Sequence, residues 1–150
     1  MIQRILIAAM LFGTLFVQSS DAAVWIRDDM GGALGDYILK FSSIRKSGQL
    51  VVIDGDCYSA CTLVTGAVPR KNICITPRAA LGFHAALVPN FFGGLVVNDA
   101  ATHAMFNLYP NNIKIWVNRH GGLGMRPIIL SGRDLASMYP ACPQSVDSRL

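Results

Sequence analysis

The feature that most constrains the fold is a strand, a helix and a second strand that follow one another between Val24 and Ile53. Residues 24–27 form a short apolar run, which a turn at Gly31-Gly32 ends. Apolar residues then recur at helical spacing from Ala33 to Lys46, and Leu50–Ile53 is a continuous apolar run typical of a strand that is buried on both faces. Because a helix separates the two strands, we expect them to be parallel neighbours joined by a right-handed crossover.

The rest of the chain continues this alternation, which predicts an α/β fold with a mostly parallel sheet. The segment Val88–Val97 combines proline and glycines with aromatics and is predicted to be a loop. The further predicted strands are Ile73–Thr76 and Ala80–His84, and the further predicted helices are a short one through Ala67, Asp99–Leu108, Asn112–Arg119 and one from an N-cap at Ser131 to Met138.

The N-terminus has the three zones of a secretory signal peptide. A basic start with Arg4 precedes an apolar run from Ile5 to Val17 and a stretch of polar and small residues. The apolar run is shorter than the roughly 20 residues of a membrane-spanning helix, so we expect cleavage after Ala22 or Ala23, with retention as a membrane anchor as the alternative. The prediction is an exported protein, in the bacterial periplasm, with a signal peptide at residues 1–23 and a single domain at residues 24–150.

The charge pattern argues against a nucleic-acid partner. The formal charge is +4, from 13 Lys and Arg against 9 Asp and Glu, but most basic residues stand singly. Arg45-Lys46 and Arg70-Lys71 are too short to form a nucleic-acid footprint. The chain contains no glutamate, so any carboxylate chemistry must use aspartates.

Four cysteines lie in the exported part: Cys57, Cys61, Cys74 and Cys142. An oxidising compartment favours disulfides, and the sequence leaves all three pairings open. Cys57 and Cys61 with a histidine are an alternative zinc site, but two close cysteines without a second close pair are a weak metal signature. We therefore expect disulfides, with no metal and no cofactor.

Three features fall at the ends of predicted strands, where open α/β sheets usually place their sites. They are the turn Gly31-Gly32, Ser59 at the start of a short helix, and His84. The backbone N–H of Ala60 lies at the helix start, free of intrahelical bonding. Together with a second N–H from the glycine turn, it could receive the oxygen charge that develops in acyl transfer. The simpler interpretations are a helix cap for Ser59 and a buried core residue for His84.

A family resemblance rests on these same residues. The turn Gly31-Gly32, the segment Cys57-Tyr-Ser-Ala-Cys-Thr62 and the segment Leu81-Gly-Phe-His84 resemble the active-site layout of the Clp protease proteolytic subunit in the ClpP/crotonase fold. The resemblance is closest to small uncharacterised periplasmic proteins of bacteria. It extends from about Val24 to Tyr139.

The resemblance implies a serine hydrolase that acts on peptide or ester bonds. Ser59 takes the place of the nucleophile and His84 that of its base, while Gly32 and Ala60 supply the N–H groups of the oxyanion hole. Cys57 and Cys61 flank the serine closely in sequence. We expect these two cysteines to hold the serine turn through disulfides, with Cys74 as a candidate partner.

The chain departs from the family pattern in two respects. The family places its third catalytic residue, an aspartate, before the final helix, but Gly124–Leu130 contains no acid. Asp134 is the nearest candidate, although complementing the helix dipole is an equally good role for it, and Asp99 is a fallback. The N-terminal strands of larger members are also absent, so the sheet must be smaller or be completed by a partner chain, which predicts an oligomer.

Two hypotheses compete with the hydrolase. One is a non-catalytic envelope protein that keeps the fold and binds a peptide or protein partner in its cleft or at its sheet edge. The other is a cysteine-linked structural protein of the envelope without a ligand. His103 and His120 have no part in any of these hypotheses, because their polar surroundings predict surface positions.

Overall fold

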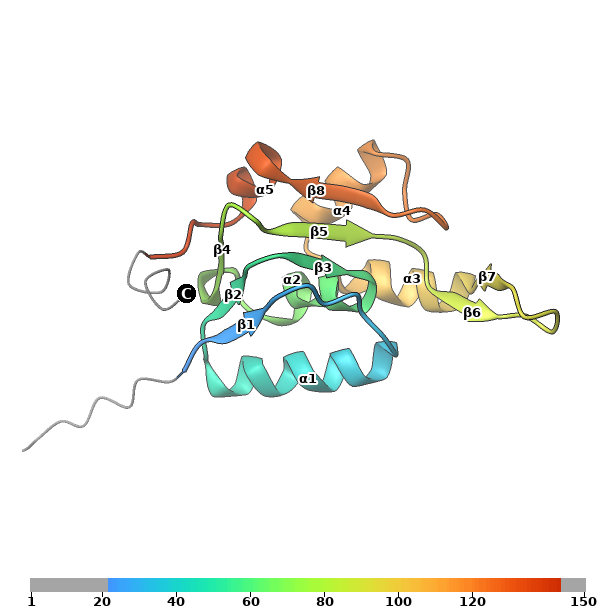
Figure 1. The fold of residues 1–150 in the computed structure, drawn as a ribbon, viewed down its shortest axis with the longest axis horizontal. Helices are drawn as coiled ribbons and strands as arrows, with labels where there is room; N and C mark the ends of the chain where they lie inside the picture. The colour runs from blue at the N-terminus through green and yellow to red at the C-terminus, as the bar shows by residue number, and fades with distance from the viewer. Residues whose placement is uncertain (1–21, 144–150) are drawn as a thin grey trace, which may run out of the picture.

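The computed structural model describes residues 22–143 and has a mixed α/β fold (Figure 1). The predicted signal peptide falls almost entirely outside these residues. None of the helices within the described range has the length and hydrophobicity of a membrane span. The α-helices of this range are α1 (Leu34–Ser47), α2 (Val64–Ala67), α3 (Asp99–Leu108), α4 (Asn111–Arg119) and α5 (Gly132–Met138), with two short 3-10 helices, η1 (Ser59–Leu63) and η2 (Arg70–Asn72).

Within residues 22–143 the strands form three small sheets, of which the first is entirely parallel. In the second sheet the first two strands are parallel, and the third is antiparallel to its neighbour. In the first sheet the strands lie in the order β1 (Val24–Ile26), β2 (Val51–Ile53) and β4 (Ile73–Ile75). In the second sheet the order is β3 (Asp56–Tyr58), β5 (Ala80–Phe83) and β8 (Ile128–Ser131). The third sheet is the antiparallel hairpin of β6 (Leu87–Pro89) and β7 (Leu95–Val97). The predicted parallel pairing of β1 with β2 across a helix is confirmed.

The chain runs from β2 directly into β3, and backbone hydrogen bonds extend the pairing of each of the first two sheets toward the other. Thr76 N donates to Ile53 O at 3.0 Å, and Ala80 N donates to Gly55 O at 3.0 Å. On the outer side, Asp29 N donates to Asp56 O at 2.7 Å, so the chain after β1 runs beside β3. The strands therefore form one bent layer, with β2 and β4 at one end and β3 and β5 at the other.

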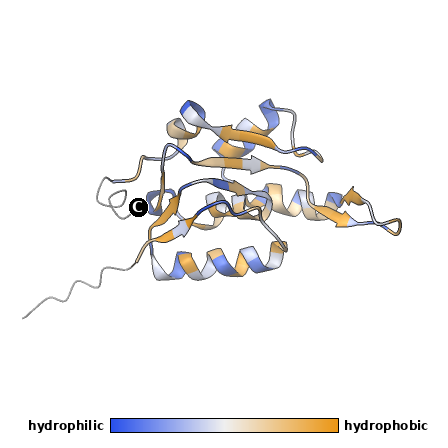
Figure 2. Ribbon diagram, viewed as in Figure 1, coloured by the Kyte–Doolittle hydropathy of each residue, from blue (hydrophilic) through white to orange (hydrophobic). Residues whose placement is uncertain are grey.

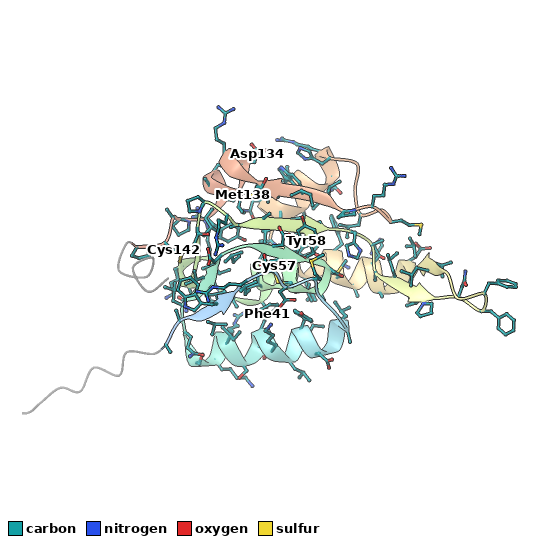
Figure 3. All side chains as sticks on the ribbon, in the orientation of Figure 1. Phe41, Cys57, Tyr58, Asp134, Met138 and Cys142 are labelled. Carbon is teal, nitrogen blue, oxygen red and sulfur yellow. A yellow bond between two sulfur atoms is a disulfide. The ribbon has the colours of Figure 1, made fainter. Side chains whose placement is uncertain are left out.

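The hydrophobic core fills both sides of this layer. Phe41 of α1 is fully buried and its side chain points from the helix toward the strands (Figure 3). From β5, the fully buried Phe83 contacts Tyr109 edge to face at 5.2 Å and Trp116 at 6.0 Å between ring centroids. These contacts hold α1, α3 and α4 against the strands that carry the candidate site.

Two predictions about the second half of the chain are wrong. Val88–Val97 is not a loop: its two apolar ends pair with each other as β6 and β7, with Val88 opposite Val96. Ile128–Ser131 is a strand that was not predicted, and it pairs antiparallel to β5. The apolar runs in these segments are short and show little periodicity, so the sequence did not indicate that they are strands.

The cysteines form two disulfides, Cys57–Cys61 and Cys74–Cys142. The expectation of disulfides is confirmed, while the suggested partnership of Cys74 with the serine turn is wrong. Cys74 instead joins β4 to the segment after α5, beside the backbone bond from Cys142 N to Ile75 O at 3.0 Å. Two disulfides fit an oxidising compartment.

Candidate active site

Ser59 lies at the turn between β3 and the helix η1, with a backbone φ of 54°. A positive φ is rare for a residue other than glycine, and it is costly, on the order of 1–3 kcal/mol, where the surroundings impose it. Strained turns of this kind, from strand into helix, present the nucleophile in many hydrolases. The strain is therefore an observation that favours a functional role for Ser59, which is the first residue of η1, whereas Tyr58 holds the N-cap position.

The backbone of this turn is held from the side of α3. The Ser59 carbonyl accepts a hydrogen bond from Thr62 Oγ1 at 2.6 Å, and Thr62 Oγ1 in turn lies 2.6 Å from the hydroxyl of Tyr109. Thr62 and Tyr109 are both buried. Burial raises the pKa of Tyr109 to about 12, partly opposed by its hydrogen bond with Thr62. A neutral tyrosine thus fixes the serine turn throughout the physiological pH range.

The glycine turn after β1 touches the serine turn directly. A Cβ atom on Gly31 would lie 2.6 Å from Ser59 Cβ and 2.9 Å from Ala60 N, so only glycine fits here. Gly31 also has a φ of 84°, which side chains disfavour. The glycine turn therefore brings its backbone against the nucleophile candidate.

Asp29 anchors the glycine turn, a role that was not predicted from the sequence. Its Oδ1 accepts the N–H of Gly31 at 3.0 Å and the hydroxyl of Tyr37, and its Oδ2 pairs with Lys40 Nζ at 3.1 Å. Burial by itself would raise the pKa of Asp29, but the hydrogen bonds from Tyr37, Gly31 and Lys40 lower it below its usual value. Asp29 is thus ionised and binds the backbone beside Ser59.

His84 follows β5 and is half-buried. Its Nδ1 lies 2.7 Å from the carbonyl oxygen of Ala85. A carbonyl oxygen can only accept, so Nδ1 carries the hydrogen, and in the neutral ring Nε2 keeps its lone pair. This is the tautomer that a general base needs, and here a backbone carbonyl holds it.

One pocket of about 270 Å³ brings the predicted site residues together. Ser59, His84, Gly32 and Ala60 all line it. The other lining residues are small or apolar: Ala33, Leu34, Ala86, Leu87, Val88, Ala101 and Met105. Ser59 and His84 are the polar side chains among these residues, and the lining contains no aspartate, lysine or arginine. An apolar surrounding of this kind strengthens the electrostatic interactions within the site.

The acid candidates lie elsewhere. Asp134 is on α5, at the edge of the fold beyond β8 (Figure 3), and its Oδ2 accepts the Trp116 indole N–H at 3.4 Å. Asp99 is exposed in the first turn of α3. Neither of these two described residues lines the pocket. Within the described residues, the Ser59 hydroxyl also makes no hydrogen bond to the His84 ring.

The rest of the described chain contains no comparable combination of a serine nucleophile and a histidine base in a pocket. A hollow of about 370 Å³ beside α5 is larger than the serine pocket, but Thr76 and Arg133 are its polar lining residues and it holds no nucleophile with a base. His103 and His120 are exposed, as predicted. Residues 22–143 contain no group of three or more metal-ligating side chains.

The sequence contained a partial signal for the anchor of the glycine turn. Asp28-Asp29 directly precedes the turn, but no sequence pattern shows that the second carboxylate points back to Gly31 and reaches Tyr37 and Lys40 on α1. In comparisons with known proteins, no family model, curated protein or solved structure matches this chain.

Proposed function

We propose that this chain is an exported serine hydrolase of the ClpP/crotonase-like type, acting on peptide or ester bonds in the bacterial periplasm. The observation that carries the proposal is the single pocket lined by Ser59, His84, Gly32 and Ala60. The positive φ of Ser59 and the hydrogen bond of His84 Nδ1 support it independently. The two disulfides support the export that the N-terminal sequence predicts.

In the proposed reaction, Ser59 Oγ attacks the carbonyl carbon of the substrate while His84 Nε2 takes the hydroxyl proton. The oxygen of the tetrahedral intermediate receives hydrogen bonds from the N–H groups of Ala60 and Gly32. His84 then gives its proton to the leaving amine or alcohol, which leaves an acyl group on Ser59. A water molecule that His84 activates releases the acid product and restores the serine.

The Ala85 carbonyl takes over part of the role that an acid has in a catalytic triad. It orients the ring and selects the tautomer, but it has no negative charge to stabilise the imidazolium that forms. We therefore expect slow turnover, and a pocket without charged lining residues favours a neutral, apolar group next to the scissile bond.

Labelling with a fluorophosphonate probe tests the proposal. The folded, disulfide-bonded protein should react with the probe, and Ser59→Ala and His84→Ala should abolish or strongly reduce the reaction. Ser43→Ala, at an exposed serine on α1, is the matched control and should label like the wild type. Labelling that persists in Ser59→Ala would exclude this serine as the nucleophile.

The second candidate is a non-catalytic envelope protein that binds an apolar peptide segment in the same pocket. The separation of Asp134 from the pocket and the missing hydrogen bond between the described Ser59 and His84 favour this candidate. It predicts no reaction with the probe, together with saturable binding of short apolar peptides that Ser59→Ala leaves intact. A bulky change in the lining, Ala101→Phe, should block that binding.

A further inference from the structure

The hairpin of β6 and β7 projects from the main body of the fold (Figure 1) and ends in two exposed aromatic residues. Phe91 is 96% exposed and Phe92 is 91% exposed, more than any other large apolar residue of the described chain. The two rings contact each other edge to face at 5.6 Å. Exposure this complete is unfavourable in water, and it calls for a partner that covers the tip.

The hairpin carries no charge, and its strands are apolar. From Ala85 to Asn98 the sequence contains no acidic or basic residue. Figure 2 shows both strands of the hairpin in hydrophobic colours, in contrast to α1, along which hydrophobic and hydrophilic colours alternate. A charged side chain at the tip would oppose entry into an apolar phase, and this tip has none.

The turn also satisfies most of its own backbone donors. Asn90 Oδ1 accepts the N–H groups of Phe92 and Gly94, each at 2.9 Å. Asn90 N donates to Gly94 O at 2.8 Å, and Gly93 N donates to Asn90 O at 3.1 Å. A polar protein surface could supply hydrogen-bond acceptors to these N–H groups, so internal hydrogen bonds matter little for contact with a protein. A lipid bilayer offers no such acceptors in its hydrocarbon region, so a tip that enters it needs internal hydrogen bonds.

The size of the tip fits a bilayer better than a protein partner. Two exposed phenylalanine side chains present about 400 Å², whereas each partner of a stable protein complex buries about 800 Å². A bilayer interface needs no matching surface, and aromatic residues are the ones that enter it most readily. The formal charge of +4 adds attraction to anionic lipid.

We propose that the tip of the β6–β7 hairpin is a membrane contact that inserts Phe91 and Phe92 shallowly into the surface of an anionic lipid bilayer. The strands stay at the level of the headgroups, where water satisfies their outer edges. Leu87 and Val88 belong both to β6 and to the lining of the serine pocket, so insertion also brings that pocket to the bilayer surface. The proposal does not depend on hydrolysis.

Co-sedimentation of the full-length mature protein with lipid vesicles tests this contact. The protein should bind vesicles of phosphatidylcholine with phosphatidylglycerol more strongly than vesicles of phosphatidylcholine alone. Phe91→Ser and Phe92→Ser should each lower the partition coefficient about tenfold, because each removes one large apolar side chain from the interface. Since both rings are exposed, circular dichroism should show these variants to be folded.

Two control variants show whether the hairpin tip itself makes the contact. Leu39→Ser removes a side chain of α1 that is 72% exposed, and it should leave vesicle binding unchanged. Ser59→Ala should also bind vesicles like the wild type, whether or not the protein is a hydrolase. The proposal is overturned if the wild type binds neither kind of vesicle, or if the double variant Phe91→Ser with Phe92→Ser binds them as well as the wild type. The proposal is also overturned if the double substitution leaves vesicle binding intact and sedimentation equilibrium shows that its only effect is to dissociate an oligomer into monomers.

Discussion

The two ends of the bent strand layer are built differently. At the end formed by β2 and β4, the disulfide Cys74–Cys142 links residues 68 positions apart, and the buried carboxylate of Asp54 is paired with arginines. At the end formed by β3 and β5, the disulfide Cys57–Cys61 closes a separation of only 4 residues, around a serine with strained backbone. The first end holds distant segments together, whereas the second holds one turn in an unfavourable shape. The features that link distant segments and the candidate site therefore lie at opposite ends of the layer.

The largest expected effect is the loss of the long-range disulfide. Replacing Cys74 and Cys142 with alanine should lower the free energy of unfolding by about 4 kcal/mol, because the unfolded chain regains the entropy of a 68-residue separation. The same change at Cys57 and Cys61 opens a much shorter loop and should cost about 2 kcal/mol. Urea denaturation of both double variants measures the difference, and equal losses would contradict the contrast between the two ends.

The next effect concerns Asp54, whose side chain is 1% exposed. Its carboxylate accepts Arg78 Nη2 at 2.6 Å and Thr76 Oγ1 at 2.8 Å, and these bonds, with Arg78 first, lower its pKa despite the opposing effect of burial. Asp54→Asn should cost about 2 kcal/mol near neutral pH, the usual loss for hydrogen bonds to a charged group. Asp36→Asn, on the exposed surface of α1, is the control and should change stability little.

The pH dependence of the same variant gives a second measurement. The folded-state pKa of Asp54 is below the unfolded value of about 3.9, so its contribution is complete above that value and disappears as pH falls through the folded-state pKa. The stability difference between wild type and Asp54→Asn should therefore shrink below about pH 4. A difference that stays constant down to acid unfolding would show that the ionised carboxylate is not the cause.

A smaller effect is expected at the anchor of the glycine turn. Asp29→Ala removes the acceptor that holds the Gly31 N–H, so the proposed oxyanion donors lose their fixed position, and probe labelling should slow about tenfold. Asp29→Asn keeps an acceptor oxygen and should restore most of the rate. Lys40→Ala removes an exposed ion pair and the contacts of Nζ with the Tyr37 and Phe41 rings, but it keeps the acceptor of the Gly31 N–H and should label like the wild type. If all three variants label equally, Asp29 has no positioning role.

The smallest effect tests the strain at Ser59. Ser59→Gly should abolish labelling but raise the free energy of unfolding by about 1 kcal/mol, because glycine adopts a positive φ without cost. Ser59→Ala must keep the same backbone shape and should show no such gain. Thermal denaturation of the two variants, with an expected difference of about 4 °C, checks the prediction. Equal stability would mean that the turn is not strained.

Local patterns were sufficient to predict a large part of the fold. The helical spacing of apolar residues located α1, and the continuous apolar run before Asp54 located β2, because burial leaves a regular mark on a sequence. The parallel pairing of β1 and β2 followed from the helix between them. The hairpin and β8 were missed: these strands are about as short as β2, but most of their residues are exposed or half-buried, so they are not fully buried runs of the kind that located β2.

The candidate site was predictable to a similar extent. Ser59, His84 and the glycine turn were selected because they stand at the ends of predicted strands, and the carboxyl ends of neighbouring parallel strands meet at one edge. Their shared pocket agrees with that argument. The carbonyl of Ala85 and the carboxylate of Asp29 were not assigned as partners, since a side chain's hydrogen-bond partner depends on rotamers and on elements that are distant in sequence.

The amino-acid sequence by itself predicted which segments are apolar enough to be buried, that the cysteines would form disulfides, and which residue types could carry acyl transfer. Only the tertiary structure decided which cysteines pair, that Asp134 contacts Trp116, and that Phe91 and Phe92 stand uncovered at the end of a hairpin. The physical reason is the separation in sequence between the residues that interact. Periodicity and composition record the burial of a residue's own element, whereas a disulfide, a hydrogen bond or an exposed tip depends on how distant elements pack against one another.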